Sequence, residues 1–266
     1  MKSKIINFIK SLILTDEDIT TLNKEIIKEE FSLENEINVK DTSKEKFDQI
    51  MDFAISLEEK NPRGLLDLIR ILLRPLQSEL LISSVEAEEH KSHKGVSSHK
   101  FFMPNCKNLN LQYTWDKQKY NNEDFLIHLN RDPILPCPWK RRDYISTISH
   151  IGTNKLLNKP LLSNYGGEWK QDTSNHFVSI WLPWGIAFVN GGNHSISVGI
   201  INGEGTLMPT DVYDMNFLLE KVRCDGKNYI LIETNEVLDS VNDIRIAAVF
   251  EIGRILHRNK IIPMHI

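Results

Sequence analysis

Residues 188–201, with the sequence FVNGGNHSISVGII, constrain the fold more than any other stretch of the chain. The apolar run over residues 186–189 has the length of a β-strand, and Gly191 and Gly192 interrupt it with backbone that is free to adopt positive φ. Asn193 is a common N-cap residue, and the apolar positions after it have the spacing of one buried helix side. The pattern predicts a strand, a glycine turn and a helix.

This turn has the features of a phosphate-binding loop. A helix N-terminus that is reached through glycines directs backbone N–H groups at whatever lies in front of it, and the helix dipole favours an anion there. The predicted phosphate-binding residues are Gly191, Gly192, Asn193, His194 and Ser195, with His194 and Ser195 in the first helical turn. The alternative is a tight strand-to-helix turn with a buried histidine, because short glycine motifs also arise by chance.

Composition is that of a soluble globular protein with one large domain or two small ones. The chain has 266 residues, of which 41% are hydrophobic and 26% charged. A net charge of −4 gives no overall attraction to nucleic acid or anionic membrane, so any basic surface must be local. No stretch approaches the roughly 20 apolar residues of a membrane span, and the cysteines lack the spacing of zinc sites or disulfide frameworks. We therefore expect a cytoplasmic protein with no membrane partner.

The chain is expected to have an α+β fold in three regions. Residues 1–85 are predicted to be helical, with one helix opening at Asn61-Pro62 that Pro75 should kink or split. Residues 86–124 form a polar connector with an extended segment near Leu111. The histidines of the connector, including His90 and His93, are read as a solvated loop rather than as metal ligands, because nothing apolar supports them.

Residues 125–266 should hold the mixed sheet with its helices. A strand is predicted over residues 178–182, with Val178, Ile180 and Leu182 on one side. A hairpin is predicted over residues 222–234 with Asp225-Gly226 at its turn, followed by a last helix over residues 241–257.

A second informative stretch covers residues 127–152. Three prolines indicate extended chain, and Trp139-Lys140-Arg141-Arg142 follows them. The arginines could bind phosphate by bidentate hydrogen bonds, and their place at a helix N-terminus opposes the helix dipole, which suggests a functional reason. The alternative is a solvated helix start. The helix should cover residues 142–151, with a buried stripe of Ile145, Ile148 and Ile151.

Polar residues between these stretches are candidate catalytic groups. Asp172 and His176 precede the predicted strand, and His194 lies in the glycine loop. An Asp–His pair near a second histidine would suit general base catalysis or a metal ion, since imidazole titrates near neutrality. The alternative is that these residues only satisfy loop backbone groups.

Taken in this order, the two stretches resemble the ParB and sulfiredoxin-like superfamily over about residues 125–225. The shared features are a proline-rich segment leading to Arg141 and Arg142, a helix ending in ISTISHIG, and a loop GGNHS in place of the family's Gly-Gly-Cys-His-Arg. The resemblance implies a small mixed sheet that binds a nucleotide phosphate at the loop. Asn193 replaces the sulfiredoxin cysteine and Ser195 the loop arginine, so sulfiredoxin chemistry is not expected. The motifs DPILPCPW and GGNHSI are also similar to an uncharacterised bacterial family.

Two functions remain open on this basis. The first is a nuclease or NTPase that acts on a nucleoside triphosphate with Mg²⁺ or on DNA. The second is a non-catalytic regulator or protein-interaction factor, for example in phage defence, whose phosphate pocket is vestigial. The sequence does not decide whether the protein is an enzyme.

Overall fold

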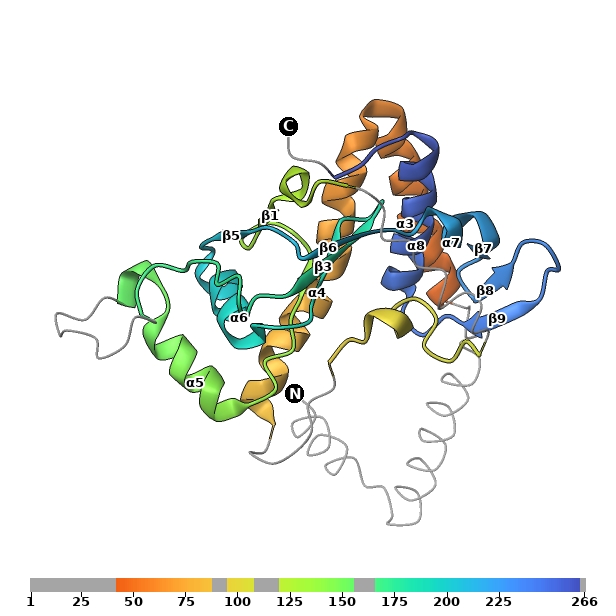
Figure 1. The fold of residues 1–266 in the computed structure, drawn as a ribbon. Helices are drawn as coiled ribbons and strands as arrows, with labels where there is room; N and C mark the ends of the chain where they lie inside the picture. The colour runs from red at the N-terminus through yellow and green to blue at the C-terminus, as the bar shows by residue number, and fades with distance from the viewer. Residues whose placement is uncertain (1–41, 88–94, 108–119, 156–165, 264–266) are drawn as a thin grey trace, which may run out of the picture. The chain divides into compact units, whose positions relative to one another are not determined.

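The computed structural model describes residues 42–87, 95–107, 120–155 and 166–263. Apart from Thr42, they belong to a unit that covers residues 43–266 (Figure 1). The expectations for residues 1–41, for His90 and His93, and for an extended segment near Leu111 lie outside the described residues.

The unit contains both helices and strands. The α-helices are α3 (Thr42–Lys60), α4 (Leu65–Glu86), α5 (Arg141–His150), α6 (Asn193–Asn202), α7 (Asn216–Lys221) and α8 (Ile244–Arg258). The 3₁₀ turns are η1 (Pro62–Gly64), η2 (Ser98–Lys100), η4 (Asn122–Phe125) and η5 (Thr153–Lys155). The strands are β1 (Ile127–His128), β2 (Ile134–Leu135), β3 (Val178–Leu182), β4 (Ile186–Val189), β5 (Thr206–Leu207), β6 (Asp211–Asp214), β7 (Val222–Cys224), β8 (Asn228–Leu231) and β9 (Val237–Ser240). The predicted α+β class is confirmed.

A mixed sheet of four strands, in the order β2-β4-β3-β6, is the centre of the fold. β3 runs antiparallel to β4 and parallel to β6. Every residue of β3 is buried, because helices and loops cover both faces of the sheet. As predicted, Val178, Ile180 and Leu182 share one face, where they pack in a core cluster with Ile196 of α6. Trp181 belongs to the cluster on the opposite face, which α4 and α8 complete.

The helix α4 belongs to the same unit as the sheet. It packs against α8 and β2, and Figure 1 shows it running beside the sheet. The boundary predicted at residue 85 therefore falls inside this unit. Pro75 does not split α4, contrary to one of the two expected outcomes. Its ring lies on the exposed side, where water can satisfy the carbonyl of Ile71 that loses its partner.

The predicted hairpin and last helix are present, whereas strand β9, which pairs with β8, was not predicted. Asp225 closes the predicted hairpin turn, because its Oδ1 accepts the backbone N–H groups of Lys227 at 2.8 Å and Asn228 at 2.7 Å. The last helix begins at Ile244 rather than at residue 241, since Asp243 caps it by accepting the N–H groups of Arg245 and Ile246.

The buried stripe predicted for α5 is wrong. Ile145 is 57% exposed, and Ile148 and Ile151 are only half-buried. Tyr144 is the buried residue of this helix, and its ring centroid lies 6.2 Å from that of His194. α5 therefore packs on α6 through an aromatic side chain next to the predicted isoleucines.

Candidate functional site

The predicted strand, glycine turn and helix are present as β4, Asn190–Gly192 and α6. Gly192 occupies the N-cap position with φ +75°, in the left-handed region that favours glycine. Asn193 is the first helical residue rather than the N-cap. Its side-chain Oδ1 instead accepts the backbone N–H of Cys137 at 2.6 Å, which ties α6 to the proline-rich segment.

Both glycines of the turn are required by close packing against the segment that precedes β3. A Cβ on Gly191 would lie 2.6 Å from a ring carbon of Phe177, and one on Gly192 would lie 2.2 Å from Cδ2 of His176. The N–H of Gly191 donates to the carbonyl of Phe177 at 3.0 Å, so this donor is already used. The glycines thus have a structural reason to be there, independent of any ligand.

His176 is buried beneath the turn and has a defined protonation pattern. Its Nδ1 accepts the backbone N–H of Asp172 at 2.9 Å, so in the neutral ring the proton must be on Nε2. Nε2 lies 2.6 Å from Oγ of Ser195 and therefore donates to it. Burial lowers the pKa of His176, with the Asp172 carboxylate opposing the shift, which favours this neutral ring. The Trp169 ring stacks on it, with centroids 5.1 Å apart.

The predicted Asp–His pair is therefore made through the backbone of Asp172. The Asp172 carboxylate points elsewhere, since its Oδ1 accepts from the N–H and the hydroxyl of Ser174 at 3.0 and 2.6 Å. These two bonds lower the pKa of Asp172. Ser195 donates its own proton to the carbonyl of Gly192 at 3.1 Å. Neither the histidine nor the serine has the arrangement of a base and the nucleophile that it activates.

His194 joins the two stretches that the sequence singled out. Its Nε2 accepts the backbone N–H of Lys140 at 3.1 Å, which leaves the proton of the neutral ring on Nδ1. Burial lowers the pKa of His194, and the Asp143 carboxylate opposes this shift. Trp139 lies next to it, 58% exposed, with ring centroids 5.8 Å apart.

The three predicted cations lie outside the cleft beside α6. Lys140 forms an ion pair with Asp143 at 2.9 Å, and Arg141 donates to the carbonyl of Ala87 at 3.1 Å. Both arginines are exposed, and neither lines the cleft. The structure brings their segment next to the glycine loop, yet it does not bring their guanidinium groups into the site.

A cleft of about 1030 Å³ runs along the N-terminus of α6. Its polar lining comes from α5, from the chain before β3 and from the glycine loop, and includes Asp143, His150, Glu168, Lys170, Asp172, His176, Asn193, His194 and Ser195. Asp143 and Glu168 were not among the predicted site residues. The i, i+3 spacing of Lys140 and Asp143 was a signal for the first, whereas Glu168 had no local signal.

The lining of the cleft contains both hydrogen-bond donors and carboxylates. The donors are the first N–H groups of α6, which have no partner within a helix, and Nδ1–H of His194. Among the described residues, no group of three or more His, Cys, Asp or Glu side chains could hold a metal ion by itself.

Within the described ranges, no helix is both long and apolar enough to cross a membrane.

Comparison with known proteins places the chain in a family without giving it an activity. No curated protein and no solved structure matches the chain. A family model matches residues 32–263, which is most of the sequence. The chain therefore belongs to DUF6710, a family of unknown function.

Proposed function

We propose that this protein binds a nucleotide phosphate, with Mg²⁺, in the cleft at the N-terminus of α6, and that it does so without turnover. The observation that carries the proposal is the fixed ring of His194. The Lys140 N–H occupies Nε2, so Nδ1–H is the ring's remaining donor, on a side chain that lines the cleft beside the first N–H groups of α6. Such a set of donors suits a phosphate oxygen.

The acidic walls explain why the nucleotide would need Mg²⁺. Asp143, Glu168 and Asp172 line the cleft, and Lys170 is the lysine among its lining residues. A bare polyphosphate would meet these carboxylates with like charge. Mg²⁺ usually binds one or two carboxylates together with substrate phosphates, and it keeps several waters, so no preformed metal cluster is required. The neighbouring Trp139, exposed at the edge of the cleft, offers a surface on which a base could stack.

Binding without turnover is favoured over hydrolysis. Nδ1 of His176 holds a backbone N–H and its Nε2 carries a proton, so this ring has no nitrogen free to accept one. The Asp172 carboxylate is engaged with Ser174. A sensor or interaction factor fits these groups better than a nuclease or NTPase does. The resemblance to ParB and sulfiredoxin-like proteins supports a phosphate ligand at the same loop.

Calorimetric titration with the four ribonucleoside triphosphates, with and without Mg²⁺, tests the proposal. We expect saturable binding that requires Mg²⁺, and about a tenfold loss of affinity in His194→Gln from one lost hydrogen bond to a charged group. His150→Gln is the matched control, because His150 is exposed on α5 in the same cleft. No nucleotide binding, or equal affinity in both variants, would exclude the proposal. Phosphate release during the same incubation would show turnover, and tight binding of single-stranded DNA alone would point to nucleic acid.

A further inference from the structure

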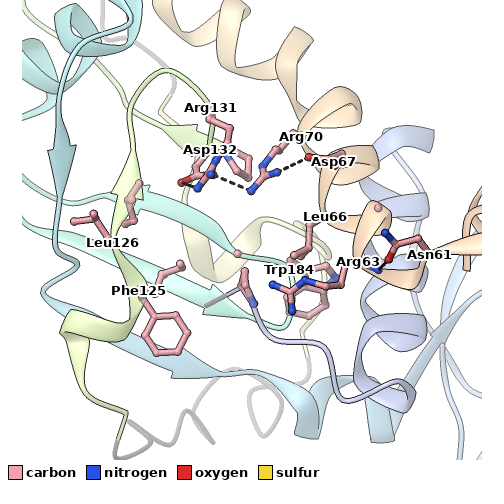
Figure 2. A pocket seen from close by; sticks show the side chains of 16 residues that line it. Asn61, Arg63, Leu66, Asp67, Arg70, Phe125, Leu126, Arg131, Asp132 and Trp184 are labelled. Carbon is pink, nitrogen blue, oxygen red and sulfur yellow. Dashed lines mark hydrogen bonds and ion pairs between the residues drawn. The ribbon is translucent and has the colours of Figure 1, made fainter. Parts of the chain in front are cut away.

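A second cavity, of about 360 Å³, lies away from the α6 cleft. It is formed between the start of α4, the segment from Phe125 to Pro133, and the turn at Trp184 and Gly185 (Figure 2). Its apolar lining includes Leu66, Phe125, Ile180 and Trp184, which are all buried. The charged lining consists of Arg63, Asp67, Arg70, Arg131 and Asp132.

Most of these charged side chains pair with one another. Asp132, which is 7% exposed, accepts from Arg70 at 3.1 Å and from Arg131 at 2.9 Å. Arg70 also pairs with Asp67, and Figure 2 shows it lying between the two aspartates. This network ties α4 to the turn before β2. Both carboxylates of the cavity are therefore already neutralised by arginines.

Arg63 is the cation of the cavity that takes no part in this network of ion pairs. Its side chain makes no ion pair or hydrogen bond with any part of the chain that the structure describes, although its backbone N–H donates to Oδ1 of Asn61 at 3.1 Å. Three arginines and two aspartates line the cavity, which leaves a formal excess of one positive charge. The N-terminus of α4 and its preceding turn η1 add the positive end of a helix dipole on the same side.

We propose that this cavity binds a small organic monoanion, a carboxylate attached to an apolar or aromatic body. The carboxylate pairs with the Arg63 guanidinium, which presents two parallel N–H donors in the geometry of a carboxylate. The body packs against Leu126 and Pro263, which are half-buried and line the cavity beside the buried Leu66. The volume lies at the lower end of the range for small-molecule sites, which limits the ligand to a compact molecule. The site is independent of the nucleotide proposal, since it shares no residue with the α6 cleft.

The test uses benzoate as the probe and benzamide, its neutral analogue of the same shape, as the control ligand. Titration of the full chain is followed by calorimetry and by saturation-transfer NMR. We expect saturable benzoate binding, no detectable benzamide binding, and about a tenfold or greater loss of benzoate affinity in Arg63→Gln. Arg245→Gln is the matched control, because Arg245 is also exposed near a helix start but does not line the cavity. Arg63→Lys should restore only part of the affinity, since an ammonium lacks the paired donors.

Three results would overturn the proposal. They are the absence of saturable benzoate binding to the wild-type protein, equal benzoate affinity in Arg63→Gln and Arg245→Gln, and equal binding of benzoate and benzamide. Melting temperatures of both variants, measured beforehand, separate lost binding from lost folding. Failure at this cavity leaves the nucleotide result unaffected, because the two titrations use different ligands and different variants.

Discussion

The backbone N–H of Asp172 donates to Nδ1 of His176 at 2.9 Å, and this one bond determines what His176 can do. It places the ring proton on Nε2, which faces Ser195 Oγ at 2.6 Å. The serine is thus an acceptor from the histidine and a donor to the carbonyl of Gly192. The distance between His176 and Ser195 resembles that of a catalytic pair, but the positions of the protons do not. The contact is a structural hydrogen bond that links the glycine turn to the chain before β3.

Ser195→Ala should lower the stability of the protein. Ser195 is not expected to act as a nucleophile. The substitution removes the acceptor of the buried Nε2–H of His176, which costs about 1 to 3 kcal/mol in the free energy of unfolding. Urea denaturation measures this loss. Ser149→Ala, at an exposed serine of α5, should change the free energy far less. Labelling of Ser195 by a fluorophosphonate reagent would contradict the structural role.

Stability should fall on acidification as His176, which is buried, and His194, which is half-buried, take up protons. Burial lowers the pKa of both His176 and His194 below the ordinary value of 6.5. Below about pH 6.5 the unfolded chain therefore binds protons that the folded chain does not. The free energy of unfolding falls as pH falls toward the folded-state pKa. Urea midpoints between about pH 8 and about pH 5 should show this trend. His176→Asn should flatten it, whereas His257→Asn, at the half-exposed end of α8, should keep it.

Short sequence patterns were enough to predict the elements whose structure depends on neighbouring residues. The apolar run, the two glycines and the polar helix start predicted β4, the turn and α6 within a residue or so, because φ preference and helix periodicity act over short distances. The Asp225-Gly226 turn was predicted for the same reason.

The features that could not be predicted from the sequence depend on contacts between segments that are far apart in the chain. The clash of a Cβ at Gly192 with His176 depends on how the segment before β3 crosses the turn, and the protonation of His176 depends on a backbone N–H. The cavity beside Arg63 joins positions more than 60 residues apart, through contacts such as Arg70 to Asp132. No periodicity in either segment carries that information.

Gly192→Ala should destabilise the fold more than Gly203→Ala does. Both residues have left-handed φ, +75° and +68°, so both variants carry the backbone strain of an alanine there, about 1 kcal/mol. A Cβ at Gly192 would also lie 2.2 Å from Cδ2 of His176, whereas one at Gly203 would meet only Asn130 Cβ at 3.8 Å. The difference between their unfolding free energies measures the clash. Valine at Gly192 adds further atoms at the same place and is therefore not expected to leave the fold intact.

Asp132→Asn should be among the most damaging single substitutions in this region, because it removes the charge that holds two arginines. Burial of Asp132 opposes its ionisation, yet Arg131, the His128 N–H and Arg70 together lower its pKa. A carboxyl whose folded pKa is lowered stabilises the fold above its unfolded pKa of about 3.9 and loses this contribution as pH falls through the folded value. The loss at neutral pH should be about 1 to 3 kcal/mol, the cost of hydrogen-bonding groups left without their charged partner, because Arg70 keeps its pair with Asp67 and Arg131 is 41% exposed. Asp67→Asn is the control, since the Asp67 side chain is 70% exposed and pairs with the same Arg70. If the two variants unfold at the same urea concentration at neutral pH, then Asp132 does not hold α4 to the turn before β2.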